Sequence, residues 1–246
     1  MPLFPVQIQR AIFSLCVAIG MGTATVNAGL IDPGLEIEWW VDGVYAGKLQ
    51  PTGTYNKNAG WWNYQGAAND PFSGVNLTFD LNGDPDPLIS GNLVVENLLL
   101  PSVDITLLVM LPIAPVITVN TELIGSASLG LTTDSGGGSL STMAGKPLWQ
   151  GMIDGSPVGL GASLFFDPFM LSNNGLGSAG SSANFGSPLP EIGPPALDSI
   201  GIEINFTLTQ LDQASITSVF HVVGVPAPGV IGLLAIGALG IGRRRR

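Results

Sequence analysis

Apolar residues recur at every second position in several segments of this chain, and this spacing constrains the fold more than any other sequence feature. The clearest segment is 200–208, where Ile200, Ile202, Ile204, Phe206 and Leu208 alternate with small or polar residues. The same period appears over 35–41, 75–81 and 103–111. Because successive side chains of a strand point to opposite faces of a sheet, each segment predicts a strand with one buried face.

The segment 29–224 contains many such short strands and no convincing helical pattern. This order predicts an all-β fold: a single antiparallel β-sandwich, with a jelly-roll-like arrangement as one variant. Its length fits one large β domain with a full hydrophobic core. The residues predicted to face inward are Leu35, Ile37, Leu77, Phe79, Ile105, Leu107, Ile202, Ile204 and Phe206.

Glycine, proline and short polar residues mark the predicted connections. Asp42-Gly43 lies between two alternating runs and predicts a tight hairpin turn. Asp134–Ser139 is glycine-rich and predicts a flexible turn. Asn173–Pro195 is rich in Gly, Ser, Asn and Pro, and predicts a long surface loop.

The end of the sequence has three parts in a fixed order. Val225-Pro226-Ala227-Pro228 precedes an uncharged run of 14 residues, Gly229 to Gly242, which Arg243-Arg244-Arg245-Arg246 follows. As a helix the run would rise about 21 Å, short of the roughly 30 Å hydrocarbon core of a bilayer unless the preceding residues extend it. The arginines favour retention on the cytoplasmic side. The alternative is a core helix followed by a basic end.

These three parts resemble the PEP-CTERM sorting domain of Gram-negative bacteria. Ala227 stands where the family usually has glutamate. The resemblance implies a transmembrane helix, a processing enzyme of the exosortase type, and a surface or matrix protein without a defined activity. The segment 200–208, followed by 210–213 and 216–223, is also similar to other members, which implies a final hairpin leading into the sorting motif.

The N-terminus predicts a signal peptide over residues 1–28. Arg10 supplies positive charge, Ala11–Met21 is apolar, and Val26-Asn27-Ala28 predicts cleavage between Ala28 and Gly29. The only cysteine, Cys16, lies in the apolar part, so the mature chain would have no disulfide. An N-terminal membrane anchor is the alternative.

The predicted signal peptide and the predicted tail together imply a route for the protein. We expect export, transient anchoring in the inner membrane through 225–246, and delivery to the cell surface or outside the cell.

The predicted ectodomain, 29–224, is strongly acidic. It holds all 18 acidic residues, three lysines and no arginine, a net charge of −15. Nucleic-acid binding depends on Lys and Arg neutralising phosphates, so that class of function is excluded. An acidic surface is compatible with solubility outside the cell or with divalent cations.

The inventory of reactive side chains disfavours several kinds of catalysis. His221 is the only histidine, and it lies opposite the face that carries Ile216, Phe220 and Val222. A Ser-His pair or a zinc site is therefore not expected. Glycoside hydrolysis needs two facing carboxylates, and the sequence does not pair its candidates. These candidates are Glu36, Glu38, Glu96, Glu122 and Glu203. We predict a protein that is not an enzyme.

Oxygen ligands at alternate positions make one candidate calcium site. These ligands are Asp80, Asn82, Asp84 and Asp86. The start resembles an EF-hand loop, but Pro85 replaces the glycine and Gly91 the closing acid. The two interpretations are calcium held in another geometry, or an acidic turn after the strand 75–81.

Tryptophans are the candidate glycan contacts. Alternation places Trp39 in the core and Trp40 on the face that carries Glu36 and Glu38. Trp40, Trp61 and Trp62 could stack on sugar rings; the alternative is that the segment 60–64 covers Trp40.

Two hypotheses for function follow. The first is a non-enzymatic exported protein whose ectodomain is structural or adhesive, with the inner membrane, an exosortase-type enzyme and surface polysaccharide as partners. The second is a glycan-binding or glycan-cleaving module with the same tail.

Overall fold

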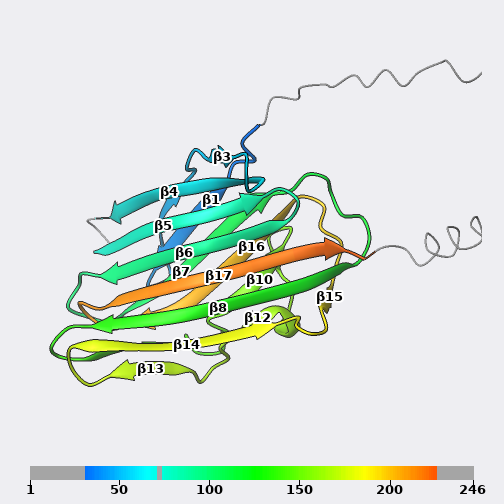
Figure 1. Cartoon of the computed structure of the whole chain (residues 1–246). Coiled ribbons are helices and arrows are strands. Elements are labelled where there is room, and N and C mark those ends of the chain that lie inside the picture. The colour runs from blue at the N-terminus through cyan, green and yellow to red at the C-terminus, as the bar shows by residue number, and fades with distance from the viewer. Residues whose placement is uncertain (1–30, 71–73, 226–246) are drawn as a thin grey trace, which may run out of the picture. The chain divides into compact units, whose positions relative to one another are not determined.

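The described part of the chain is a sandwich of two antiparallel sheets. The computed structural model describes residues 31–70 and 74–225, and Figure 1 shows one sheet lying in front of the other. Within these residues the sheet connections contain one short 3₁₀ turn, Leu160–Ala162, and no helix long and apolar enough to span a membrane. The predicted signal peptide with its cleavage site at Ala28 and Gly29, and the predicted sorting tail from Pro226 to Arg246, lie outside the described residues.

The back sheet of Figure 1, sheet A, has the strand order β11-β10-β16-β7-β1-β2, with β12 paired to β10 and β9 paired to β16 and β13. Its strands are β1 (Glu36–Val41), β2 (Val44–Leu49), β7 (Val103–Pro112), β9 (Gly138–Ser141), β10 (Trp149–Ile153), β11 (Ser156–Pro157), β12 (Ser163–Leu164), β13 (Met170–Asn173) and β16 (Ser199–Leu208).

The front sheet, sheet B, has the order β14-β8-β17-β6-β5-β4-β3, with β15 paired to β8. Its strands are β3 (Thr54–Asn56), β4 (Trp61–Asp70), β5 (Val75–Asp84), β6 (Leu88–Asn97), β8 (Thr121–Thr133), β14 (Gly177–Phe185), β15 (Glu191–Gly193) and β17 (Gln213–Gly224).

The core lies between the inner faces of the two sheets, as the alternation predicts. All nine residues predicted to face inward are buried, and they belong to one continuous cluster. Trp149 and Phe220 are fully buried in the same cluster, one from each sheet, with ring centroids 5.9 Å apart. Burying apolar surface is the main driving force for folding, at about 25 cal/mol per Å².

The connection from β16 to β17 carries the chain from sheet A to sheet B. The predicted final hairpin of these strands is therefore wrong: β17 pairs with β6 and β8, and β16 pairs with β7, β9 and β10. The physical reason is that both strands carry a continuous apolar face. Placed on opposite sheets, the two faces pack against the same core instead of lying side by side.

A buried amide holds this crossing in place. The side chain of Asn97, at the end of β6, is fully buried. Its Nδ2 donates to the carbonyl oxygens of Pro101, Leu208 and Thr209 at 2.9, 3.2 and 3.1 Å, and its Oδ1 accepts from Leu99 N at 2.9 Å. One side chain thus joins sheet B to the end of a sheet A strand and satisfies backbone groups that burial would otherwise leave unpaired.

Two of the three predicted connections are confirmed as turns. Asp42 and Gly43 join β1 to β2 with φ values of 51° and 75°, the left-handed conformation that a two-residue hairpin turn requires. Asp134 begins the turn before β9, where its Oδ1 accepts from Gly136 N at 2.7 Å.

The predicted loop over Asn173–Pro195 is wrong, because it contains β14 and β15. Strand β14 pairs along its whole length with β8, from Gly177 opposite Thr133 to Phe185 opposite Gly125. It lies at the edge of sheet B and consists mostly of Gly, Ser and Ala. Such residues give almost no contrast between the two faces, so the period of two is not visible, while the neighbouring strand supplies the hydrogen bonds.

Asp32 fastens the start of the described chain to sheet B. Its carboxylate accepts from Gly34 N at 2.9 Å, Gly53 N at 2.6 Å and the Tyr64 hydroxyl at 2.7 Å. Partial burial alone would raise the pKa of Asp32, but these three hydrogen bonds outweigh it and lower the pKa. Burial, and then the neighbouring carboxylate, raise the pKa of Tyr64.

Asp154 makes a similar contact on sheet A. It lies in the turn between β10 and β11, and its Oδ1 accepts from the backbone N–H groups of Leu197, Asp198 and Ser199 at 3.1, 2.8 and 3.0 Å. Burial alone would raise the pKa of Asp154, but the backbone donors lower it overall. The segment leading into β16 is thereby held against the neighbouring turn.

We predict that Asn97→Ala lowers the free energy of unfolding by about 3 kcal/mol, because it leaves several buried backbone groups without partners. Urea denaturation followed by tryptophan fluorescence measures the change. Asn184→Ala, on the exposed face of β14, is the control and should change stability by less than about 0.5 kcal/mol. Equal effects of the two variants would contradict the role of the buried amide.

We also predict that acid weakens the fold partly through Asp32. Its pKa is lower in the folded than in the unfolded chain, so its contribution is complete above the unfolded pKa and disappears as the pH falls through the folded pKa. Stability should therefore fall below about pH 4. Asp32→Ala should flatten this dependence, with Tyr64→Phe intermediate, in urea titrations at several pH values. A slope unchanged in both variants would rule out this contribution.

Candidate functional site

The outer faces of the two sheets each carry a hollow with a partly exposed tryptophan. Trp40 lies on the outer face of sheet A and Trp61 on the outer face of sheet B. The predicted glycan contacts are therefore not one cluster. The prediction that Trp62 contacts a glycan is wrong, because Trp62 follows Trp61 in β4, faces inward and is only 8% exposed.

The Trp40 hollow has a volume of about 390 Å³ and lies over β1, β7, β10 and β16. Its apolar lining includes Leu108, Met143 and Met152. Trp40 contacts Tyr45 edge to face, with ring centroids 5.6 Å apart. The alternative that segment 60–64 covers Trp40 is wrong, because that segment enters β4 in the opposite sheet.

Polar side chains at the base of the Trp40 hollow form a network around Asn205. The Asn205 side chain is fully buried. Its Oδ1 accepts from Thr106 Oγ1 at 2.9 Å and Lys146 Nζ at 3.4 Å, and its Nδ2 donates to Glu203 Oε1 at 3.2 Å. Gln150 Nε2 donates to the other Glu203 oxygen at 2.5 Å. A mostly apolar hollow with a few fixed polar groups is the usual form of a small-molecule site.

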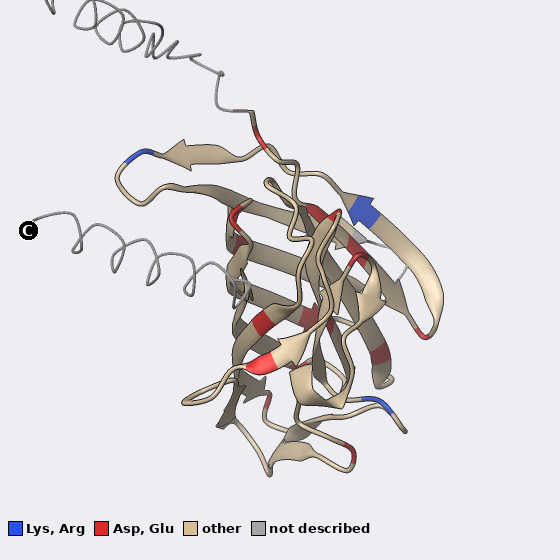
Figure 2. Cartoon of the chain, turned by 90° about the vertical axis from the view of Figure 1, so that its right-hand side faces the viewer, with Lys and Arg blue, Asp and Glu red and all other residues tan. Residues whose placement is uncertain are grey.

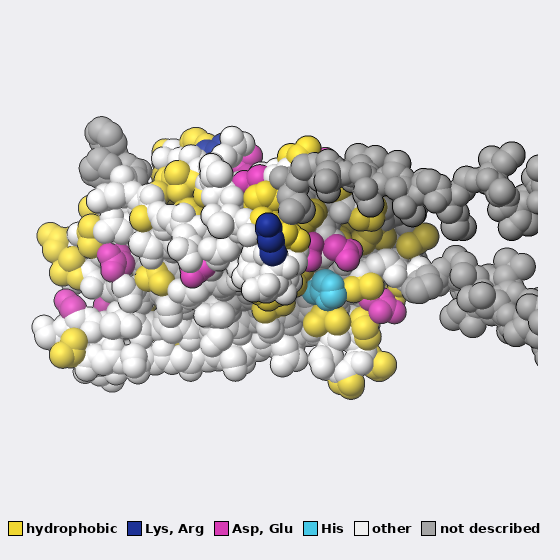
Figure 3. Space-filling model, turned by 45° about the horizontal axis from the view of Figure 1, so that its top comes forward, with side chains coloured by type: hydrophobic (Ala, Val, Ile, Leu, Met, Phe, Trp, Pro, Cys, Tyr) yellow, Lys and Arg dark blue, Asp and Glu magenta, His cyan; other side chains and the backbone are white. Residues whose placement is uncertain are grey.

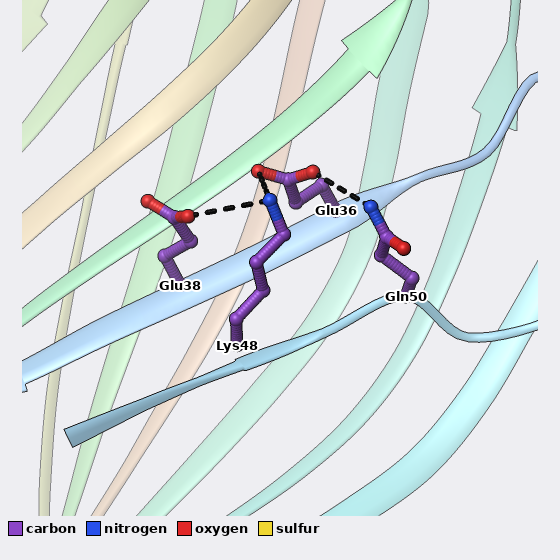
Figure 4. A network of polar contacts seen from close by, with 4 residues as sticks. All are labelled: Glu36, Glu38, Lys48 and Gln50. Atoms are coloured by element: carbon purple, nitrogen blue, oxygen red, sulfur yellow. Dashed lines mark hydrogen bonds and ion pairs between the residues drawn. The ribbon is translucent and has the colours of Figure 1, made fainter.

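Beside this hollow, a charged network covers the edge of sheet A (Figure 4). Lys48 Nζ lies 2.6 Å from Glu36 Oε1 and 3.5 Å from Glu38 Oε1, and Gln50 Nε2 donates to Glu36 Oε2 at 3.0 Å. The Lys48 ammonium lowers the pKa of Glu36, and Glu36 in turn raises the pKa of Lys48. Both side chains are partly exposed to solvent, so the pair contributes little to stability.

The five candidate glutamates are divided between the two outer faces. Glu36, Glu38 and Glu203 lie on sheet A, while Glu96 and Glu122 lie on sheet B, where Glu96 accepts from Gln213 at 2.7 Å and Asn76 at 3.3 Å. Glu203 is the one carboxylate among the described residues that line the Trp40 hollow. Glu36 and Glu38 share one lysine instead of facing each other across a hollow.

Three of the four candidate calcium ligands lie in β5, and Asp86 lies in the turn that follows it. Asp80 and Asn82 point outward from sheet B and accept from Asn63 Nδ2 at 2.8 and 3.1 Å. Asp84 Oδ1 accepts from Asp86 N at 3.0 Å, which is the acidic turn of the alternative interpretation. Over residues 31–70 and 74–225, no three His, Cys, Asp or Glu side chains gather closely enough to hold a metal ion. The structure therefore gives the calcium interpretation no assembled carboxylate cluster.

The Trp61 hollow has a volume of about 500 Å³ and lies where the β3–β4 hairpin meets β5. Besides Trp61, its lining consists of Tyr55, neutral polar side chains and one lysine. These residues are Thr54, Asn56, Lys57, Asn63, Gln65 and Asn82. Tyr55 packs on the buried Trp62 with ring centroids 5.4 Å apart, which fixes the hairpin over the sheet.

Sequence reasoning named Trp61 but missed its amide neighbours. Trp61, Asn63 and Gln65 alternate along β4, so the period of two could have placed all three on one face. In contrast, Lys146 of the Trp40 hollow and the buried Asn205 beneath it come from distant parts of the sequence, and no local pattern relates them. His221 faces outward, opposite the buried Phe220 and Val222, as predicted.

Acidic residues are distributed over both sheets and their connections, and basic residues are few (Figure 2). Lys48, Lys57 and Lys146 are the lysines of the described ranges, which contain no arginine.

A scan against protein-family models and a search of curated proteins gave no match for this chain. The residues themselves therefore carry the functional argument.

We predict that Lys48→Gln raises the pKa of Glu36 towards the ordinary carboxyl value, because Glu36 loses the nearby positive charge and its charged hydrogen-bond donor. A carbon-13 NMR titration of the Glu36 carboxyl measures the change. Lys57→Gln, in the β3–β4 connection on the other sheet, is the control and should leave the titration of Glu36 unchanged. An unaltered Glu36 titration in Lys48→Gln would show that the network of Figure 4 does not form in solution.

Proposed function

We propose that this is a non-enzymatic exported protein, sorted to the cell surface or extracellular matrix, with an adhesive or structural ectodomain. The observation that carries the proposal is the sequence of the tail: a proline motif from Val225, an apolar run, and four arginines. An exosortase-type enzyme would process this tail at the inner membrane. The signal peptide over 1–28, the tail helix and the jelly-roll-like variant of the sandwich are parts of the same proposal.

The end of the described chain supports a direct connection between ectodomain and tail. Strand β17 ends at Gly224, and Val225 N donates to Asn120 O at 2.9 Å. The first residue of the motif is thus bonded to the sandwich, and the described residues leave no spacer between them. This fits a boundary at 224/225, with the motif presented beside a folded domain.

The placement of the carboxylates supports binding over catalysis. Retaining and inverting glycosidases need two carboxyl groups about 5 to 9.5 Å apart on either side of the substrate. The Trp40 hollow holds Glu203, which Gln150 and Asn205 bind, while Lys48 occupies Glu36 and Glu38. An adhesive surface needs only shape and hydrogen-bonding groups.

The second candidate function is glycan binding by the ectodomain. The observation that favours it is the pair of partly exposed tryptophans, each beside fixed polar side chains: Trp40 above the Asn205 network, and Trp61 beside Asn63 and Gln65. Sugar rings combine apolar faces with hydroxyl groups, and such mixed surfaces match both features.

We predict two cleavages in the native host: one before Gly29, and one in or near 225–229. The second follows because proline keeps the preceding residue extended, which suits a protease at the membrane face. Intact-mass analysis of the surface or released form measures both ends. Replacing Arg243 to Arg246 with serine should weaken retention in the membrane and leave the melting temperature of the ectodomain unchanged.

The matched control is the lysine version of the same four positions, which keeps the positive charge and should restore retention. A mature form that still carries Gly229 to Arg246 would make the tail a permanent anchor and overturn the sorting proposal.

A further inference from the structure

We infer that the outer face of sheet B binds a linear, neutral polysaccharide, which lies across the strands from the Trp61 hollow towards β14. The inference rests on the glycan-binding candidate above and gives it a site, an orientation and a ligand class. It starts from the chemistry of the Trp61 hollow. Four of its lining side chains, Asn56, Asn63, Gln65 and Asn82, are amides. An amide both donates and accepts hydrogen bonds, as a sugar hydroxyl does.

The amides of the hollow are held in place before any ligand binds. Asn63 Nδ2 donates to Asp80 Oδ1 and Asn82 Oδ1 at 2.8 and 3.1 Å, and Gln65 Nε2 donates to Asp80 Oδ2 at 3.2 Å. Binding therefore does not have to order these side chains, which removes part of the entropic cost of association. Trp61 beside them supplies an apolar surface for the face of a sugar ring.

Residues in register with the amides of the hollow continue this surface across six strands, and all of them except Val219 are polar. Two rows run from β4 through β5, β6, β17 and β8 to β14. The first row is Gln65, Asp80, Asn92, Thr217, Ser128 and Ser182. The second row is Asn63, Asn82, Ser90, Val219, Ser126 and Asn184.

The dimensions of these rows indicate an extended ligand. Neighbouring strands lie about 4.8 Å apart, so six strands cover about 24 Å. A second hollow, of about 220 Å³, lies at the far end of both rows, and Ser128, Ser182 and Thr217 contribute to its lining. A single sugar would occupy one hollow and leave the rest of the rows unused, whereas a linear chain contacts both ends.

Charge decides the class of polysaccharide. Asp80 is the only charged member of the two rows, and Lys57 is the one charged residue in the lining of the Trp61 hollow; both belong to an ectodomain of net charge −15. An anionic polysaccharide would be repelled by this field, so a neutral chain is favoured. Figure 3 shows a broad white area of neutral side chains and backbone along the lower part of the view. An apolar protein partner would instead need a contiguous apolar patch.

The opposite face fits this ligand less well. The Trp40 hollow is lined by Leu108, Met143 and Met152, and its polar base contains the charged groups Lys146 and Glu203. Its side chains suit a compact, partly apolar ligand. Trp40 and Trp61 therefore provide a matched pair of tryptophans, one outside and one inside the inferred site, for the same experiment.

The test is isothermal titration calorimetry with the full-length chain in a detergent without sugar headgroups. The probes are the hexasaccharides of cellulose, xylan and mannan, with hexagalacturonate as the anionic comparison. We expect binding of at least one neutral hexasaccharide and none of hexagalacturonate. Trp61→Ala should weaken binding about tenfold, the size of one lost aromatic contact. Trp40→Ala should leave the affinity unchanged, and both variants should keep the wild-type melting temperature.

A second variant tests the length of the site. Ser128→Phe places a bulky ring at the far end of the first row, in β8. It should weaken binding of the neutral hexasaccharide without affecting binding of the matching disaccharide at the Trp61 hollow. Equal effects on both ligands, or none on either, would overturn the extended orientation.

Loss of binding in Trp40→Ala but not Trp61→Ala would move the glycan site to sheet A and overturn the inference. Absence of binding to every neutral probe, or binding of hexagalacturonate alone, would overturn it while leaving the sorting proposal to its own mass-spectrometric test.

Discussion

The buried amide of Asn97 fixes the position of one sheet over the other at one end of the sandwich. Apolar packing between the sheets is strong but non-directional, so it tolerates small shifts of one sheet over the other. Asn97 is directional: it binds carbonyl oxygens of Leu208 and Thr209 from the end of β16 while it terminates β6. The same crossing leads into β17, which pairs with β6. This contact fixes the end of the sandwich from which the long strands β6, β16 and β17 extend.

With the core provided by the inner faces, the two outer faces are free to differ in chemistry. Sheet A presents Trp40, exposed charged groups around Lys48, and a hollow with methionine in its lining. Sheet B presents amides and hydroxyls in register, with Trp61 near one edge. In a protein sorted to the cell surface, as proposed above, one face could contact a polymer while the other meets a different neighbour or solvent.

The sequence predicted the core well because alternation is a local property of each strand. It placed Ile204 and Phe206 inward and Trp40 outward, and could have separated Trp61 from Trp62 by the same phase. It failed for β14, where Gly, Ser and Ala give the two faces the same character. It also failed for the partner of β17, because proximity along the chain does not say which sheet a strand joins. Lys146 and Asn205 meet only through the fold, so that part of the Trp40 hollow had no local signal.

The bond between Val225 and Asn120 has a mechanical consequence. Three residues, Pro226 to Pro228, separate Val225 from the apolar run, and the four Cα–Cα steps from Val225 to Gly229 can span at most about 14 Å. A pull on the tail would therefore act almost directly on the end of β17. That strand lies between β6 and β8 and pairs with both. Because antiparallel hydrogen bonds run perpendicular to the strands, a force along β17 loads both ladders in shear, with many bonds resisting together, instead of opening them one at a time.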